Sequence, residues 1–205
     1  MNHFADITDG ANARGVTLAN ADCAFVKLGR STPAALDTTT AQLNVLAGGQ
    51  VDGSSLGIRG QNGAAHFLQR FALRPHGAYD QVAAMKFALA RQNPFVTEAI
   101  SGRSNSPYPA TSHSLLTTGN PNVLLWAVKP AEEGIGQGVI ARVWNLSPEA
   151  QNCTVTLAAG ISAAKQVTHI ETDLEVLTVS EGRVSISLAG RQIQTLRLLP
   201  TPNSK

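Results

Sequence analysis

The feature that most constrains the fold is a two-residue alternation of apolar and polar side chains in the last third of the chain. Cys153, Val155 and Leu157 alternate with threonines, and in 183–188 a valine, an isoleucine and a leucine alternate with an arginine and two serines. In an extended chain this period puts the apolar groups on one face, as in a half-buried antiparallel strand. The pattern therefore predicts a mainly β fold, an antiparallel β-sandwich.

Further apolar and β-branched segments are expected to be strands: 15–28, 42–47, 66–73, 123–128 and 139–144. The run 123–128 is continuously apolar, which predicts a strand covered on both faces. Trp126 and Trp144 lie within these runs and are expected to pack in the core. The glycine-rich segment 129–138 has the length of a hairpin connection.

One segment has the pattern of a helix. In 79–92, a valine, a methionine and a leucine recur at helical spacing. Asp80 is placed to cap the N-terminus, and Asn93-Pro94 is expected to end the helix. We therefore expect one short helix near residues 80–92.

A polar, proline-punctuated stretch divides the chain. Residues 105–118 are expected to be a linker between a β-rich unit at 15–104 and a C-terminal β-sandwich at 119–200. Residues 1–14 are expected to be disordered or added for expression, and 201–205 are expected to form a tail.

Composition limits the classes of function. The 16 Lys and Arg against 14 Asp and Glu give a net charge of +2, too little for a patch that follows a phosphate backbone, so we expect no nucleic-acid partner. No stretch reaches the roughly 20 apolar residues of a membrane span, so we expect no membrane partner. Two cysteines are too few for a disulfide framework, which favours a bacterial cytoplasm.

The adjacent acids Glu132 and Glu133 are one candidate for glycosidase chemistry, which needs two carboxylates across one sugar. On an extended chain, however, neighbouring side chains point to opposite sides. Their place in a glycine-rich connection favours a solvated turn over a catalytic pair.

The segment 169–175 offers four ligand-type side chains: His169, Glu171, Asp173 and Glu175. If the segment is extended, all four share a face and are a set that suits a hard cation such as calcium. Positions on one face run along a strand without meeting at a point, so a solvated strand face is the preferred interpretation. We assign no metal ligand.

The remaining motifs supply no nucleophile. His76, next to a turn, is expected to bond a backbone group, with a sugar contact as the alternative. Gly53-Ser-Ser-Leu-Gly57 matches the Gly-x-Ser-x-Gly elbow, but the helix that this motif requires is not predicted after it. We therefore expect neither catalytic residues nor a bound cofactor in this chain.

Four regions of the chain, in order, resemble the C-terminal β region of glycoside hydrolase family 38, the α-mannosidases. They are residues 15–20 (GVTLAN), 69–76 (QRFALRPH), 122–134 (NVLLWAVKPAEEG) with 139–145 (VIARVWN), and 171–175 (ETDLE) with 194–198 (QTLRL). They are similar to the family patterns G-V-x-L-x-N, F-x-Y-A-L-x-P-H, V-x-x-x-A-x-K-x-A-E-D-G with R-x-Y-N, and T-x-L-E with K-T-L-R-L. The resemblance covers residues 15–198.

This resemblance implies part of a galactose-mutarotase-like supersandwich, followed by a C-terminal β-sandwich. In the family, the zinc ion, its ligands and the nucleophilic aspartate lie in an N-terminal β/α domain, and no segment here matches their motifs. The resemblance therefore implies a fragment to which no catalytic residue carries over. In some relatives a β-domain loop brings an arginine to the sugar, which makes Arg59, in the glycine-rich loop 48–65, a candidate for contact with the sugar cleft. His76, from its own position next to a turn, is the other candidate.

We therefore expect the non-catalytic C-terminal β-domain of an α-mannosidase-type retaining glycoside hydrolase. Its partners would be the missing zinc-dependent catalytic domain, whose cleft it shapes, and through that domain a mannose-containing saccharide. Whether the chain forms a homo-oligomer is left open. The alternatives are an independent carbohydrate-binding β-sandwich and a structural interaction module.

Overall fold

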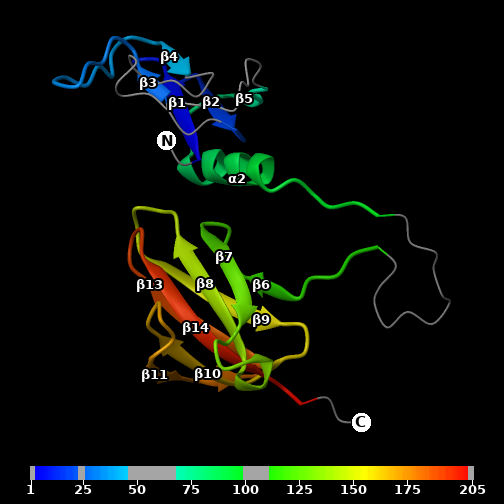
Figure 1. Cartoon of the computed structure of the whole chain (residues 1–205). Coiled ribbons are helices and arrows are strands. Elements are labelled where there is room, and N and C mark those ends of the chain that lie inside the picture. Colours follow the sequence, from blue (N-terminus) through cyan, green and yellow to red (C-terminus); the bar gives the residue numbers. More distant parts are fainter. Residues whose placement is uncertain (1–2, 23–25, 46–67, 99–110, 203–205) are drawn as a thin grey trace. The chain divides into compact units, whose positions relative to one another are not determined.

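The computed structural model describes residues 3–22, 26–45, 68–98 and 111–202 (Figure 1). The chain divides into two compact units, Met1–Glu98 and Ala99–Lys205. All strand pairs described in them are antiparallel, and the described residues contain one α-helix. The predicted mainly β fold with one short helix is confirmed.

The C-terminal unit is a sandwich of two sheets. One has five strands in the order β11-β10-β14-β8-β7, and the other has four in the order β12-β13-β9-β6 (Figure 1). The strands are β6 (Leu116–Thr118), β7 (Val123–Pro130), β8 (Val139–Asn145), β9 (Gln151–Leu157), β10 (Ile161–Val167), β11 (Asp173–Leu177), β12 (Val179–Ser180), β13 (Arg183–Leu188) and β14 (Ile193–Pro200). A 3₁₀ turn, η1 (Ile135–Gln137), lies in the β7–β8 connection.

The core of the sandwich follows the two-residue alternation. On β13, and on β9 from Cys153 onward, every second side chain is buried, while the residues between them are exposed or half-buried. The cluster that these strands share with the other sheet includes Val143, Val155, Val184, Leu188, Leu196 and Leu198, all of them fully buried. Each such side chain contributes about 1.5–3 kcal/mol when it leaves water. The burial predicted from the alternation is therefore confirmed.

Two connections at one end of the sandwich are packed together. Asn145, fully buried at the end of β8, donates from Nδ2 to the carbonyl oxygens of Glu149 (2.7 Å) and Ala189 (2.8 Å). A Cβ at Gly190 would lie 1.8 Å from the carbonyl oxygen of Pro148, so this position has no room for a side chain. The β8–β9 and β13–β14 connections thus fix each other.

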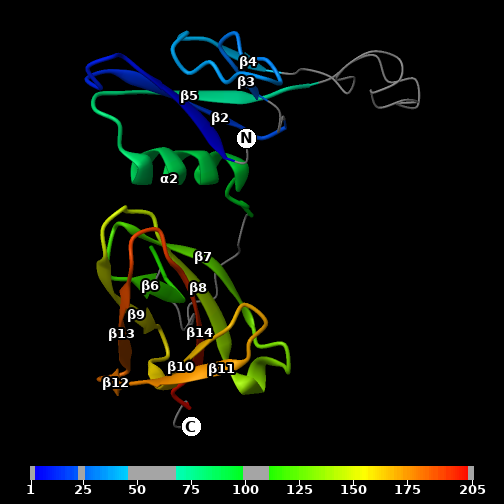
Figure 2. The same cartoon turned by 90° about the vertical axis from the view of Figure 1, so that its left-hand side faces the viewer.

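The N-terminal unit has a three-stranded sheet, in the order β1 (Phe4–Thr8), β2 (Gly15–Asn20) and β5 (Phe71–His76), and a hairpin of β3 (Val26–Leu28) and β4 (Leu43–Val45). Helix α2 (Gln81–Gln92) packs against β2 and β1, and Figure 2 shows it along one side of the sheet, with the hairpin on the other.

The helix begins and ends where the sequence predicts. The Asp80 side chain accepts a hydrogen bond from the Ala83 backbone N–H (3.1 Å), and Asn93 closes the C-terminus. Ala84, Met85 and Ala88 form its buried stripe. No helix of the described residues is both long and apolar enough to cross a membrane.

One face of the three-stranded sheet carries exposed apolar side chains. The register pairs Val16 with Pro75 and Leu18 with Leu73, so alternate residues of β2 and β5 share this face. Val16, Phe71 and Leu73 are 37%, 37% and 65% exposed.

Three expectations about boundaries are corrected. Residues 1–14 were expected to be disordered, but Phe4–Thr8 forms β1 and pairs in register with β2; five residues are too few for a reliable periodicity. Part of the expected linker, Leu116–Thr118, forms β6 against β9. The expected strand 15–28 is not continuous, because β2 and β3 belong to different sheets.

The expectation that β7 is covered on both faces is also wrong. Trp126 and Val128 are 39% and 40% exposed, and Trp126 meets Trp144 edge-on, with ring centroids 5.5 Å apart, outside the core cluster. Two sheets that face each other cover only one side of each strand, so half of a continuous apolar run points outward.

Candidate functional site

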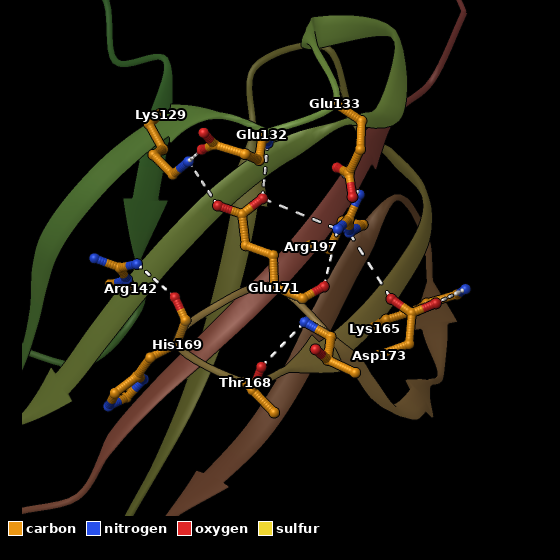
Figure 3. Close-up of polar contacts among 11 residues, drawn as sticks. Lys129, Glu132, Glu133, Arg142, Lys165, Thr168, His169, Glu171, Asp173 and Arg197 are labelled. Atoms are coloured by element: carbon orange, nitrogen blue, oxygen red, sulfur yellow. Dashed lines mark hydrogen bonds and ion pairs between the residues drawn. The ribbon is translucent and has the colours of Figure 1, made fainter.

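Three segments far apart in the sequence meet on the outer face of the five-stranded sheet (Figure 3). The β7–β8 hairpin supplies Lys129 and Glu133, the β10–β11 connection supplies Glu171, and β14 supplies Arg197. Because β14 lies between β10 and β8 in the sheet, Arg197 stands between the other two segments. Each segment belongs to one of the regions that carry the family resemblance.

A tight turn directs Glu171 toward the hairpin. The backbone N–H of Thr168 donates to the Thr172 carbonyl (2.8 Å), and that of Glu171 donates to the Thr168 carbonyl (3.0 Å). Glu171 itself has φ 67°, in the left-handed region that few non-glycine residues adopt. The expected segment 169–175 is therefore extended only from Asp173 onward, in β11, and its four ligand-type side chains do not share one strand face.

The Glu171 carboxylate is the buried centre of an ion-pair network. Its side chain is 5% exposed; Oε1 lies 2.6 Å from Lys129 Nζ, and Oε2 accepts a hydrogen bond from the Glu132 backbone N–H (2.8 Å). The hydrogen bonds from Lys129 and then from Glu132 hold the pKa of Glu171 below its usual range, against the opposing effect of burial. The turn is thereby fastened to the hairpin.

Arg197 extends the network toward β11. One terminal nitrogen donates to Glu133 Oε2 (3.0 Å), and the other donates to the Glu171 carbonyl (3.0 Å). Lys165 Nζ lies 2.5 Å from Asp173 Oδ2. The bond to Arg197 lowers the pKa of Glu133, and the bond to Lys165 lowers that of Asp173. Both acids therefore stay ionised at neutral pH.

These groups surround a recess of about 600 Å³ between the hairpin and β11. Its lining residues are Glu133, Gln137, Lys165, Glu171, Thr172, Asp173, Arg197 and Leu199.

The arrangement is unsuited to acid–base catalysis of glycoside hydrolysis. A general acid at neutral pH needs a raised pKa, whereas Glu133, Glu171 and Asp173 all have lowered ones. Within the described ranges, no group of three or more His, Cys, Asp or Glu side chains is placed to hold a metal ion. Zinc, which the family resemblance implies for the catalytic domain, does not fit acids that lysine and arginine already occupy.

The expected solvated turn carries ion pairs of its own. Glu132 and Glu133 are 81% and 59% exposed, and they pair with Lys129 (2.8 Å) and Arg197, respectively.

Arg59 and the segment 53–57 lie outside the described residues.

His76 belongs to the N-terminal unit, where it joins β5 to β1. Nε2 lies 3.0 Å from Asp6 Oδ2, Nδ1 lies 2.9 Å from the Gly77 carbonyl oxygen, and the side chain is 6% exposed. A Cβ at Gly15 would come within 2.5 Å of the His76 ring, so the two positions depend on each other. The expected contact with a backbone group is present, and a sugar contact of His76 stays a prediction.

Sequence reasoning gave no role to Lys165 or Arg142. Arg142 donates from a terminal nitrogen to the His169 carbonyl (2.9 Å), which holds the β10–β11 turn on the sheet. Both residues are charged groups at outward positions of largely apolar strands. That break in the pattern was a signal for both residues, and Arg142 also stands at the arginine of the R-x-Y-N pattern.

A comparison with protein-family models matches residues 122–196 to the glycosyl hydrolases family 38 C-terminal beta sandwich domain. A comparison with curated proteins found no match. The matched range runs from the start of β7 into β14 and contains every residue of the network except Arg197, which follows it directly. Residues 122–196, within the C-terminal unit, are therefore a family 38 C-terminal β-sandwich domain.

Proposed function

We propose that this chain is the non-catalytic C-terminal β region of an α-mannosidase-type retaining glycoside hydrolase. The observation that carries the proposal is the family match over 122–196. The acids around the recess support it, because each is bound to lysine or arginine and is held in its ionised form. Such a domain contributes by packing and positioning.

The chain packs against a zinc-dependent catalytic domain on another stretch of polypeptide and shapes one wall of its cleft. The exposed apolar side chains of the N-terminal unit, among them Val16, Phe71 and Leu73, support this role. Contiguous exposed apolar side chains on a folded domain mark a surface that another domain covers. The mannose-containing saccharide is then cleaved on the catalytic domain.

Reconstitution tests this proposal. The chain is mixed with a family 38 catalytic domain that lacks its own β region, and co-elution and hydrolysis of an aryl α-mannoside are measured. We expect a complex that hydrolyses the substrate faster than the catalytic domain alone. Leu73→Asp should weaken the complex, whereas Leu174→Asp, at a similarly exposed leucine on β11, should not. Failure to associate, or equal association of both variants, would contradict the proposal.

A further inference from the structure

A buried histidine and a buried aspartate join the strands of the N-terminal sheet. His76 on β5 and Asp6 on β1 have side chains that are 6% and 11% exposed, and β2 lies between their strands. His76 Nε2 lies 3.0 Å from Asp6 Oδ2, and the Thr17 hydroxyl on β2 donates to the same oxygen (2.6 Å). The imidazole reaches across β2 because Gly15 has no Cβ, which would come within 2.5 Å of the ring. All three strands therefore meet at one carboxylate.

The partners of the His76 ring determine where its protons lie. Nδ1 is 2.9 Å from the Gly77 carbonyl oxygen, which can only accept a hydrogen bond, so Nδ1 carries a proton. Nε2 faces a carboxylate oxygen, which is also only an acceptor when ionised, so one further proton lies between Nε2 and Oδ2. Without that proton, a lone pair of the imidazole would face a lone pair of the carboxylate. The two residues are thus joined only while they share this proton, whichever of them carries it.

Loss of the shared proton would leave a buried and poorly compensated charge. Asp6 Oδ1 is buried and has no hydrogen-bond partner among the described residues. Asp37 lines the same cavity of about 210 Å³ as Asp6, and hydrogen bonds, first of all from the Arg30 backbone N–H, hold the pKa of Asp37 well below its usual range. Asp37 is therefore ionised at neutral pH, and a like charge near Asp6 favours the protonated pair.

The other ionisable side chains around the pair are of types that titrate at about pH 10 or above, with one exception. They are Arg74 on β5, Tyr79 before α2, with its ring centroid 6.4 Å from that of His76, and the exposed Lys86 and Arg91 on α2. Strand β2 carries no ionisable side chain. The exception is His3, next to β1, whose Nδ1 lies 2.8 Å from Gln92 Oε1. His3 is therefore the matched control for His76.

We propose that the proton shared by His76 and Asp6 is a pH-sensitive link that holds β1 to β5 across β2. In the unfolded chain, histidine releases its proton near pH 6.5 and aspartate near pH 3.9. Above about pH 6.5 the folded pair keeps a proton that the unfolded chain has lost, so the folding equilibrium constant falls by up to tenfold per pH unit. Between about pH 4 and pH 6.5 both states hold the same number of protons, and the contribution of the pair is constant.

The link bears on the surface that includes Val16, Phe71 and Leu73, because these side chains lie on the same strands β2 and β5. A rise in pH that releases β1 or β5 would disturb this surface. That consequence rests on the proposed function. The link itself is tested on the chain alone, without a catalytic domain, so its failure and the failure of the proposed function are distinguishable.

Nitrogen-15 NMR of the histidine rings in the full chain tests for the proton directly. The ring signals of His76, assigned by their loss in His76→Gln, should keep their positions from pH 5 to pH 8. A His76 ring that titrates near pH 6.5, as histidine does in an unfolded chain, would overturn the proposal.

Denaturant unfolding, followed by the amide NMR signals of β1 and β5, measures the effect on stability. In the wild type, the pair should lower the folding equilibrium constant by about thirtyfold between pH 5 and pH 8. Asp6→Asn should reverse the trend, because a carboxamide N–H can donate to the neutral imidazole and the folded state then needs no extra proton. His3→Gln should keep the wild-type trend. A wild-type constant that does not fall above pH 6.5, or the same fall in Asp6→Asn, would overturn the proposal, and the wild-type measurements decide it if Asp6→Asn does not fold.

Discussion

The replacement of Glu171 by alanine tests whether the ion-pair network holds the sandwich together. The carboxylate is 5% exposed, accepts a hydrogen bond from the Glu132 N–H at 2.8 Å, and lies 2.6 Å from Lys129 Nζ. A hydrogen bond to a charged acceptor contributes about 1.5–3 kcal/mol. The Lys129 pair adds less, because that lysine is 39% exposed and its charge is screened. We therefore expect Glu171→Ala to lower the free energy of unfolding by about 2–3 kcal/mol.

Denaturant unfolding, followed by the fluorescence of Trp126 and Trp144, measures this change. These are the only two tryptophans of the chain, and both lie in the C-terminal unit that contains Glu171. The matched control is Glu175→Ala on β11, an exposed acid whose side chain has no hydrogen bond or ion pair within the described residues. If the two variants unfolded at the same denaturant concentration, Glu171 would not be the centre of the network.

The same experiment has a defined pH dependence. The folded-state pKa of Glu171 is lowered from its usual value of 4.5, so ionised Glu171 stabilises the folded state above that pH. As the pH falls through the lowered pKa, the carboxylate is protonated in the folded state and this contribution is lost. The difference between wild type and Glu171→Ala should therefore be constant from about pH 6 to 8 and shrink below about pH 4.5. A difference that grew in acid would refute the reasoning.

Three other substitutions test the packing, each by denaturant unfolding. Gly190→Ala should lower the free energy of unfolding by about 2–4 kcal/mol, because its Cβ would lie 1.8 Å from a backbone carbonyl oxygen. Gly136→Ala, with open space around it, should lower that free energy by less than about 1 kcal/mol. Equal losses in the two variants would contradict this. Asn145→Ala should cost about 3 kcal/mol by leaving buried carbonyls without donors, and a cost below about 1 kcal/mol would show that water replaces them. Asp80→Ala should cost about 1 kcal/mol through loss of the α2 cap, and an unchanged midpoint for the N-terminal unit would refute it.

The regular parts of the fold could be predicted because their determinants are local. On β9 and β13 the alternation alone specifies which side chains are buried, since the two-residue period is a property of the extended backbone. The start of α2 was likewise readable, because Asp80 caps a backbone N–H only three residues away. In both cases the residues that decide the local structure lie within a few positions of one another in the sequence.

The candidate site could not be predicted in this way. Glu171 adopts φ 67° inside a turn, and its partner Lys129 lies 42 positions earlier in the chain. The periodicity of a sequence predicts neither a residue with a left-handed backbone conformation nor an ion-pair partner on another strand. From the sequence alone, the hairpin with Glu133 and the turn with Glu171 are two unrelated segments. In the structure Arg197, on β14 between them, forms ion pairs with both.

The most direct test of the account is the hydrolysis of an aryl α-mannoside by the purified chain, measured with added zinc and without any catalytic domain. The acids around the recess are paired and have lowered pKa values, so we expect no turnover above that of a Glu171→Ala control. Turnover by the wild-type chain that Glu171→Ala abolishes would contradict the proposal that this chain contributes by packing and positioning.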